Sequence, residues 1–99
     1  MTTPRITVIT GAASGIGRAT AKRFAQDGDF IIVADMNPDG GARVVEEIKT
    51  AGGNAEFRAV DVAEEESVNE LAQATEQDYG SIGALVNSAG ILQNLSQLE

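Results

Sequence analysis

A glycine-rich segment constrains the fold of this chain more than any other feature. It reads T-G-A-A-S-G-I-G from Thr10 to Gly17, follows an apolar run at residues 6–9 and precedes an amphipathic stretch. A strand, a turn and a helix in this order leave unpaired backbone N–H groups at the start of the helix, where the helix dipole also favours an anion. Gly11 permits the turn out of the strand, and Gly15 lets the backbone approach a bound diphosphate.

Apolar runs and helical patterns alternate along the rest of the chain. Further strand-like runs lie at residues 30–34, 55–60 and 84–86, and a stretch with apolar residues at helical spacing precedes each of them. Right-handed crossovers and the doubly wound rule then predict a single α/β domain over residues 1–99, a Rossmann-type parallel sheet with strand order 3-2-1-4. The predicted ligand crevice lies between strands 1 and 4, where the strand order reverses.

The helical patterns also predict which side chains face the sheet. The first helix starts near Gly15 and ends near Gly28, and Asn37 and Pro38 are typical of the cap and first residue of a second helix. The residues expected on the inward sides of the three helices are Ile16, Thr20, Ala21, Phe24 and Ala25, then Val44, Ile48 and Ala51, then Val68, Leu71, Ala72, Thr75 and Tyr79.

The glycine spacing points to a particular family. With Thr10 in front and Ile16 between the last two glycines, the pattern G-x-x-x-G-x-G resembles the cofactor loop of the short-chain dehydrogenases/reductases. The alternative is a turn that contains three glycines and binds nothing, since glycine is common in loops. The resemblance implies that the residues at the cofactor diphosphate are Gly11, Ser14, Gly15, Ile16 and Gly17.

Asp35 ends the apolar run at residues 30–34. A carboxylate at the end of the second strand can accept hydrogen bonds from both hydroxyls of the adenosine ribose, and it repels a 2′-phosphate. Members of the family that prefer NADP usually carry a basic residue just before the second glycine or just after this position, where this chain has Ser14 and Met36. We therefore expect NAD rather than NADP, although an Asp can also simply end a strand.

Two more segments fall where the resemblance places cofactor contacts. Asp61 and Val62 follow the third strand-like run and are implied at the adenine, with a helix-capping Asp as the alternative. The fourth run leads into N-S-A-G, similar to the family's N-N-A-G, with Ser88 in place of the second Asn. The resemblance implies that the first Asn steadies the central sheet. The residues that it implies near the nicotinamide ribose are Asn87, Ala89 and Gly90.

The family's proton-transfer residues have no counterpart in these 99 residues. Members use a Tyr, a Lys four positions later and a Ser, all beyond N-N-A-G. The sole tyrosine here, Tyr79, is followed four positions later by Gly83, and the last lysine is Lys49. We therefore expect a truncated NAD-binding domain without the catalytic half, and no dehydrogenase activity from this chain alone. The parent enzyme would transfer hydride between the nicotinamide and a small-molecule alcohol or carbonyl substrate.

Composition narrows the function classes. Without Cys or His, the chain has no thiolate or imidazole ligand for zinc and no histidine-based catalytic triad, so no metal site is expected. A net charge of −8 makes nucleic acid and anionic membrane surfaces poor partners. No apolar run is long enough to span a bilayer, and the start of the chain lacks a signal-peptide pattern, which favours the cytoplasm.

Other functions use parts of the same pattern. A non-catalytic nucleotide-binding or interaction module would keep the loop without the chemistry, and an S-adenosylmethionine-dependent methyltransferase also has a glycine loop and an acid after strand 2. A P-loop NTPase does not fit, because no G-K-[ST] follows the loop. The fourth strand, which carries no charge over residues 84–89, is predicted at the edge of the sheet and favours self-association.

Overall fold

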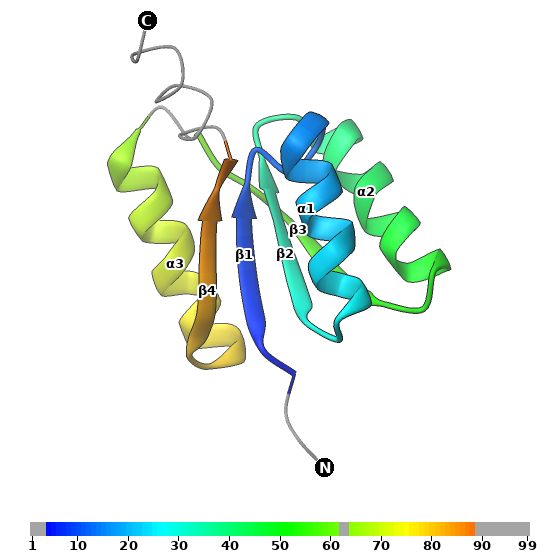
Figure 1. Ribbon diagram of the computed structural model, residues 1–99. Helices are drawn as coiled ribbons and strands as arrows, with labels where there is room; N and C mark the ends of the chain where they lie inside the picture. The colour runs from blue at the N-terminus through cyan, green and yellow to red at the C-terminus, as the bar shows by residue number, and fades with distance from the viewer. Residues whose placement is uncertain (1–3, 62–63, 89–99) are drawn as a thin grey trace, which may run out of the picture.

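Four parallel strands and three helices make up the described part of the chain (Figure 1). The computed structural model describes residues 4–61 and 64–88. The strands lie in the order β3-β2-β1-β4, and every neighbouring pair is parallel. This confirms the predicted Rossmann-type α/β fold and its strand order. The elements are β1 (Ile6–Thr10), α1 (Gly15–Gln26), β2 (Phe30–Asp35), α2 (Pro38–Thr50), β3 (Asn54–Ala59), α3 (Glu65–Tyr79) and β4 (Ile82–Asn87).

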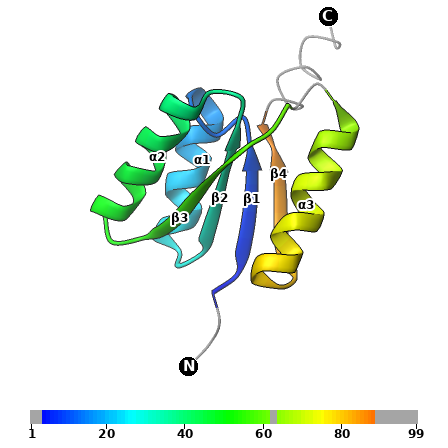
Figure 2. The same cartoon turned by 180° about the vertical axis from the view of Figure 1, so that it is seen from behind.

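The sheet is covered on both faces. Helices α1 and α2 lie together on one face, and α3 lies on the other (Figures 1 and 2). The central strands β1 and β2 therefore bury apolar side chains in both directions, which is why their sequences are nearly continuous apolar runs. The α1/α2 side holds the larger of the two cores, which includes Ile9, Ile31, Val33, Val44 and Ile48. The α3 side is built on Ile6, Val8, Ile32, Ala34, Val60 and Leu71.

Helix α2 begins as the sequence predicts. Pro38 is its first residue, and the side chain of Asn37 caps it by accepting a hydrogen bond from the backbone N–H of Gly40 at 3.0 Å. Its buried residues are Gly41, Val44 and Ile48. The prediction that Ala51 faces inward is wrong, because the helix ends at Thr50 and Ala51 is exposed.

The predicted inward faces of α1 and α3 also need correction at their ends. In α1 the buried residues are Gly17, Ala21 and Ala25, whereas Ile16 is 50% exposed in the first turn. Leu71 is buried in α3 as expected, but Tyr79 in the last turn remains 37% exposed and rests its ring on Phe30, with the ring centroids 4.9 Å apart. Periodicity assigns a residue to a side of a helix, but at a helix end that side can extend past the sheet.

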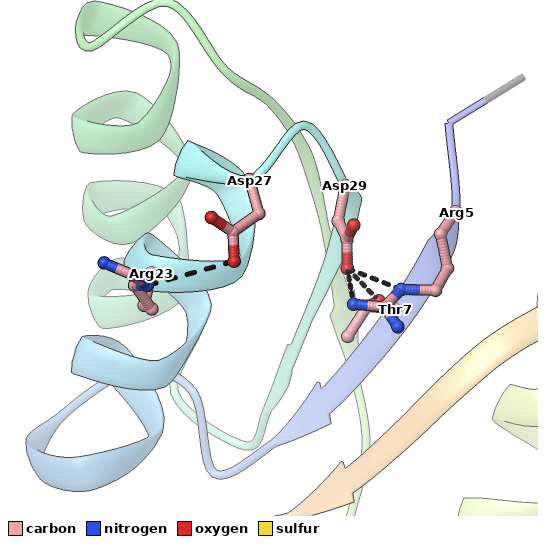
Figure 3. Close-up of polar contacts among 5 residues, drawn as sticks. All are labelled: Arg5, Thr7, Arg23, Asp27 and Asp29. Carbon is pink, nitrogen blue, oxygen red and sulfur yellow. Dashed lines mark hydrogen bonds and ion pairs between the residues drawn. The ribbon is translucent and has the colours of Figure 1, made fainter. Parts of the chain in front are cut away.

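A buried charge joins β1 to β2 at the edge where these strands begin. The Asp29 carboxylate accepts a hydrogen bond from the Thr7 hydroxyl at 2.7 Å and one from Arg5 Nε at 3.0 Å (Figure 3). The Asp29 side chain is only 8% exposed, and the Arg5 guanidinium also lies over the ring of Phe24 at 5.4 Å. The Asp29 carboxylate is therefore hydrogen-bonded to residues that stabilise the fold. It lies at the end of the sheet opposite to the predicted ligand crevice.

In the portion of the chain that the structure describes, no helix is both long and apolar enough to cross a membrane. The same residues hold no group of three or more acidic side chains arranged to bind a metal ion.

Candidate cofactor-binding site

The predicted site residues that the structure describes gather where the strands end. Thr10, the last residue of β1, pairs with Ala34 of β2 on one side and with Asn87 of β4 on the other. Because these strands are parallel, the loops that follow them leave the same edge of the sheet (Figure 1). The topology thus brings the glycine loop next to Asp35 and Asn87, although these residues are far apart in the sequence.

The three glycines of the loop occupy different environments. Gly11 and Gly15 have φ values of 68° and 58°, in the left-handed region that favours glycine. A Cβ atom on Gly15 would meet nothing within 4 Å, so space is open beside this residue. A Cβ atom on Gly17 would lie 2.1 Å from the carbonyl oxygen of Gly11 and 2.6 Å from Ser88 Oγ. Gly17 therefore permits close packing, while Gly15 leaves room for a ligand.

The start of α1 is open to an anion. Its N-cap, Ser14, is extended and exposed, and the Ser14 side chain makes no capping hydrogen bond. The first turn carries no acidic residue, and the N–H groups of the first helical residues have no intrahelical acceptor. Ile16 is half exposed beside them. These features fit the diphosphate of a dinucleotide, since aligned N–H groups and the helix dipole both attract negative charge.

Two backbone N–H groups hold the Asp35 carboxylate. Oδ2 accepts a hydrogen bond from Ala13 at 3.0 Å, and Oδ1 accepts one from Asn37 at 3.0 Å. Asp35 is partly exposed, and an ionised carboxylate has about four acceptor positions. Each oxygen of Asp35 therefore keeps acceptor capacity for a hydroxyl group of a ligand.

On the other side of the loop, the end of β4 is bonded to the end of β1. Thr10 Oγ1 lies 2.9 Å from Asn87 Oδ1, to which it donates, and the buried Ser88 hydroxyl donates to the carbonyl oxygen of Thr10 at 2.6 Å. The sequence predicted Asn87 as a site residue, but it did not predict a role for Ser88 or for the Thr10 side chain. The one indication for Ser88 was a small hydroxyl residue at a position where the family pattern has Asn.

Asp61 lies in the connection that leads from β3 to α3. Its backbone N–H donates to Ser67 Oγ at 3.1 Å, and its carbonyl oxygen accepts from the N–H of Glu64 at 3.1 Å. The N-cap of α3 is Glu64 rather than Asp61. Three further predicted cofactor contacts lie outside the described residues: Val62, Ala89 and Gly90.

The sole tyrosine is remote from this edge. Tyr79 ends α3, and its ring contacts Phe30, the first residue of β2. The guanidinium of Arg58 lies 5.7 Å from the same ring. Tyr79 is therefore part of the packing at the beginning of β2 and does not belong to the site.

Comparisons with known proteins agree with the fold and the motifs. A sequence profile described as short chain dehydrogenase matches residues 5–99. The chain is 41% identical over 88 residues to 2,5-dichloro-2,5-cyclohexadiene-1,4-diol dehydrogenase LinX from Sphingobium indicum, a match that covers 89% of this chain and 35% of that protein. A crystal structure of hydroxysteroid dehydrogenase from Escherichia coli matches with a TM-score of 0.78 and 36% identity, over 84% of this chain and 35% of the other.

A second structure bears on the cofactor. A metagenomic short-chain oxidoreductase in complex with NADP matches with a TM-score of 0.78 and 28% identity, over 82% of this chain and 37% of that one. The chain spans about a third of the length of each of these proteins. The matched profile, the sequence relatives and the strand order together show that this chain belongs to the short-chain dehydrogenase family of oxidoreductases.

Proposed function

We propose that this chain is the NAD-binding part of an oxidoreductase that transfers hydride between the nicotinamide and an alcohol or carbonyl substrate. The observation that carries the proposal is the position of the Asp35 carboxylate, which is hydrogen-bonded to Ala13 inside the glycine loop. The Asp35 carboxylate, which can accept hydrogen bonds from ribose hydroxyls, thus lies beside the glycine loop that leads into the open start of α1. Adenosine diphosphate, the common part of nicotinamide dinucleotides, has the hydroxyl and phosphate groups that this arrangement would bind.

The preference for NAD over NADP rests on charge. A 2′-phosphate at the ribose would approach the Asp35 carboxylate, which its two N–H donors hold in place. Neither Ser14 nor Met36, which flank this region, carries a compensating positive charge, and Met36 is 62% exposed. Like charges brought into contact oppose binding, so NAD is the better ligand.

The chemistry of the parent enzyme would be divided between this segment and other residues. The bound dinucleotide would supply or accept the hydride. The residues of this chain would bind the diphosphate at Gly15 and hold the adenosine ribose at Asp35. The 99 residues contain no Tyr-x-x-x-Lys, so the proposal assigns proton transfer to no residue in them.

Binding measurements test the cofactor assignment. Isothermal titration of the chain with NAD and with NADP should give at least tenfold tighter binding of NAD, and Asp35→Ser should narrow that ratio, because it removes the repelling charge. Equal affinities for wild type, or a preference for NADP, would contradict the NAD assignment. Absence of binding by either dinucleotide to a folded chain would contradict the nucleotide-binding function itself.

A non-catalytic nucleotide-binding module is the second candidate, because the glycine loop and the Asp35 carboxylate bonded to it would bind a nucleotide without any catalytic residue. We expect no oxidation of NADH above a buffer blank when the chain is mixed with a panel of ketones. Turnover above the blank would show that these residues suffice for catalysis. NAD binding without turnover agrees with both candidates, and an assay of a longer chain that includes these residues then separates them.

A further inference from the structure

Asp35 makes a contact that binding a ribose does not require. Its Oδ2 accepts a hydrogen bond from the N–H of Ala13, which stands between Gly11 and Gly15 in the glycine loop. Because both of these residues are glycines, the backbone on either side of Ala13 has more accessible conformations than other residues would allow. A bond from a carboxylate to a backbone N–H is among the stronger hydrogen bonds in proteins. The hydrogen bond to Asp35, a residue outside the glycine loop, therefore restrains the middle of that loop.

The residues after β2 add to this restraint. Asp35 Oδ1 accepts from the N–H of Asn37, whose side chain in turn accepts from the N–H of Gly40. A Cβ atom on Gly40 would lie 3.1 Å from the Cβ atom of Ala13, so the start of α2 packs closely against the loop. Asp35 therefore stands between the glycine loop and the capped start of α2, and it is bonded to both.

We propose that Asp35 is a positioning residue for the diphosphate loop as well as a ligand of the ribose. This inference rests on the proposed nucleotide-binding function. The carboxylate would hold Ala13 so that the N–H groups at the start of α1 are preorganised for the diphosphate. Its removal would then weaken binding even of a nucleotide that has no ribose hydroxyls for it to contact.

A pair of ligands separates the two roles. We would titrate wild type and Asp35→Ala with ADP and with 2′,3′-dideoxy-ADP, which keeps the diphosphate and lacks both ribose hydroxyls, and follow the amide resonances by NMR. Asp39→Asn is the matched control, because it removes one negative charge from the exposed first turn of α2, beside Gly40. Thermal unfolding of each variant verifies that the chain is folded at the titration temperature.

The proposal predicts that Asp35→Ala weakens binding of dideoxy-ADP about tenfold, because binding would then have to supply the ordering of the loop that this charge-assisted hydrogen bond otherwise provides beforehand. Asp39→Asn should leave that affinity unchanged or raise it slightly, since it removes repulsion. If Asp35 acts only through the ribose, Asp35→Ala weakens binding of ADP alone, and unchanged or tighter binding of dideoxy-ADP overturns the proposal. If folded wild type binds neither nucleotide, the proposed function is overturned and this inference with it.

Amide hydrogen exchange gives a readout that general destabilisation would not produce. In Asp35→Ala the Ala13 amide should exchange faster, because its acceptor is gone. The neighbouring Ala12 amide donates to the backbone carbonyl of Ala34 at 3.3 Å and should change little. Equal acceleration at both amides would indicate a loosened sheet edge rather than a local role, and it would contradict the proposal.

Discussion

The hydroxyl of Ser88, the residue that follows β4, donates a hydrogen bond of 2.6 Å to the carbonyl oxygen of Thr10, the last residue of β1. Ser88 is only 3% exposed, and its Oγ would lie 2.6 Å from a Cβ atom on Gly17. One buried hydroxyl is thus bonded to the start of the glycine loop and occupies the space that a side chain on Gly17 would need. The loop is supported by Ser88 on the β4 side and by Asp35 on the β2 side.

Ser88→Ala should lower the free energy of unfolding by about 1 kcal/mol, because a buried hydrogen bond is lost while the volume changes little. Urea unfolding measures this difference. Ser81→Ala is the control, since Ser81 is exposed just before β4 and its replacement should have almost no effect. Equal effects of the two substitutions would show that the Ser88 contact contributes nothing specific.

Replacing Gly15 and Gly17 separately by Ala should have different consequences. Gly17→Ala places a methyl group against the backbone of Gly11 and should destabilise the fold by about 3 kcal/mol, at the upper end for overpacking. Gly15→Ala meets no atom and should cost about 1–2 kcal/mol, because Ala is strained at φ 58°. Denaturant unfolding and NAD titration together test this contrast.

In the NAD titration, Gly15→Ala should lose most of the affinity although the chain remains folded, since its methyl group projects where the diphosphate is proposed to bind. Unchanged NAD affinity in folded Gly15→Ala would place the diphosphate elsewhere.

Two aspartates near the β1–β2 connection should differ in their effect on stability (Figure 3). Asp29→Ala leaves the fully buried Thr7 hydroxyl without its acceptor and should cost about 2–3 kcal/mol. Asp27→Ala removes an exposed ion pair with Arg23, 3.8 Å long, and should change the stability by less than about 0.5 kcal/mol. Unfolding of the two variants in guanidinium chloride measures both free-energy changes. Similar losses of stability would mean that the burial of Asp29 does not determine its contribution.

The ion pair between α1 and α2 predicts a pH dependence. The hydrogen bond from the Arg18 guanidinium holds the pKa of Glu47 below its ordinary value of 4.5. Partial burial of the carboxylate acts in the opposite direction, and the positive charges of Arg18, Lys22 and Arg43 add smaller effects that lower the pKa. Because the pKa is lower in the folded state, the unfolded chain binds the proton first as the pH falls. The stabilisation is therefore fully present well above pH 4.5 and is lost on further acidification.

Unfolding curves between pH 6 and roughly pH 3 should show this loss for wild type, and Glu47→Gln should reduce the slope of stability against pH in that range. Glu46→Gln, an exposed neighbour on α2, should retain the wild-type contribution of the ion pair. An unchanged slope in Glu47→Gln would show that the ion pair contributes nothing to the acid sensitivity.

The outer edge of β4 is proposed as the surface for self-association of this 99-residue chain. Among the described residues β4 pairs only with β1, and Leu85 is 51% exposed on it. Leu85→Lys should shift sedimentation towards the monomer, because a charge on an edge strand disfavours pairing. Ala42→Lys adds the same charge to the exposed surface of α2 and should leave association unchanged. A wild type that is monomeric at high concentration would contradict the proposal.

The alternation of apolar runs and helical stretches predicted the strand order only together with right-handed crossovers and the doubly wound rule, which leave few ways to connect parallel strands. It also predicted that Asp35 stands at the end of β2 and that Asn37 caps α2, since both follow from local positions along the chain. The same local reasoning was wrong for Ile16 and Ala51. Both lie at or beyond a helix end, where periodicity cannot tell whether anything packs opposite.

The contacts that hold the site together were decided by the tertiary structure. The bonds from Asp35 to Ala13 and from Ser88 to Thr10 join residues from different elements, as does the bond from Thr7 to Asp29 at the other edge. Each of these hydrogen bonds forms only if the neighbouring strands are correctly aligned along their length. That alignment is set by the packing of the cores on both faces of the sheet. A sequence pattern carries the period of a strand or helix, and only the packed sheet determines which donor meets which acceptor.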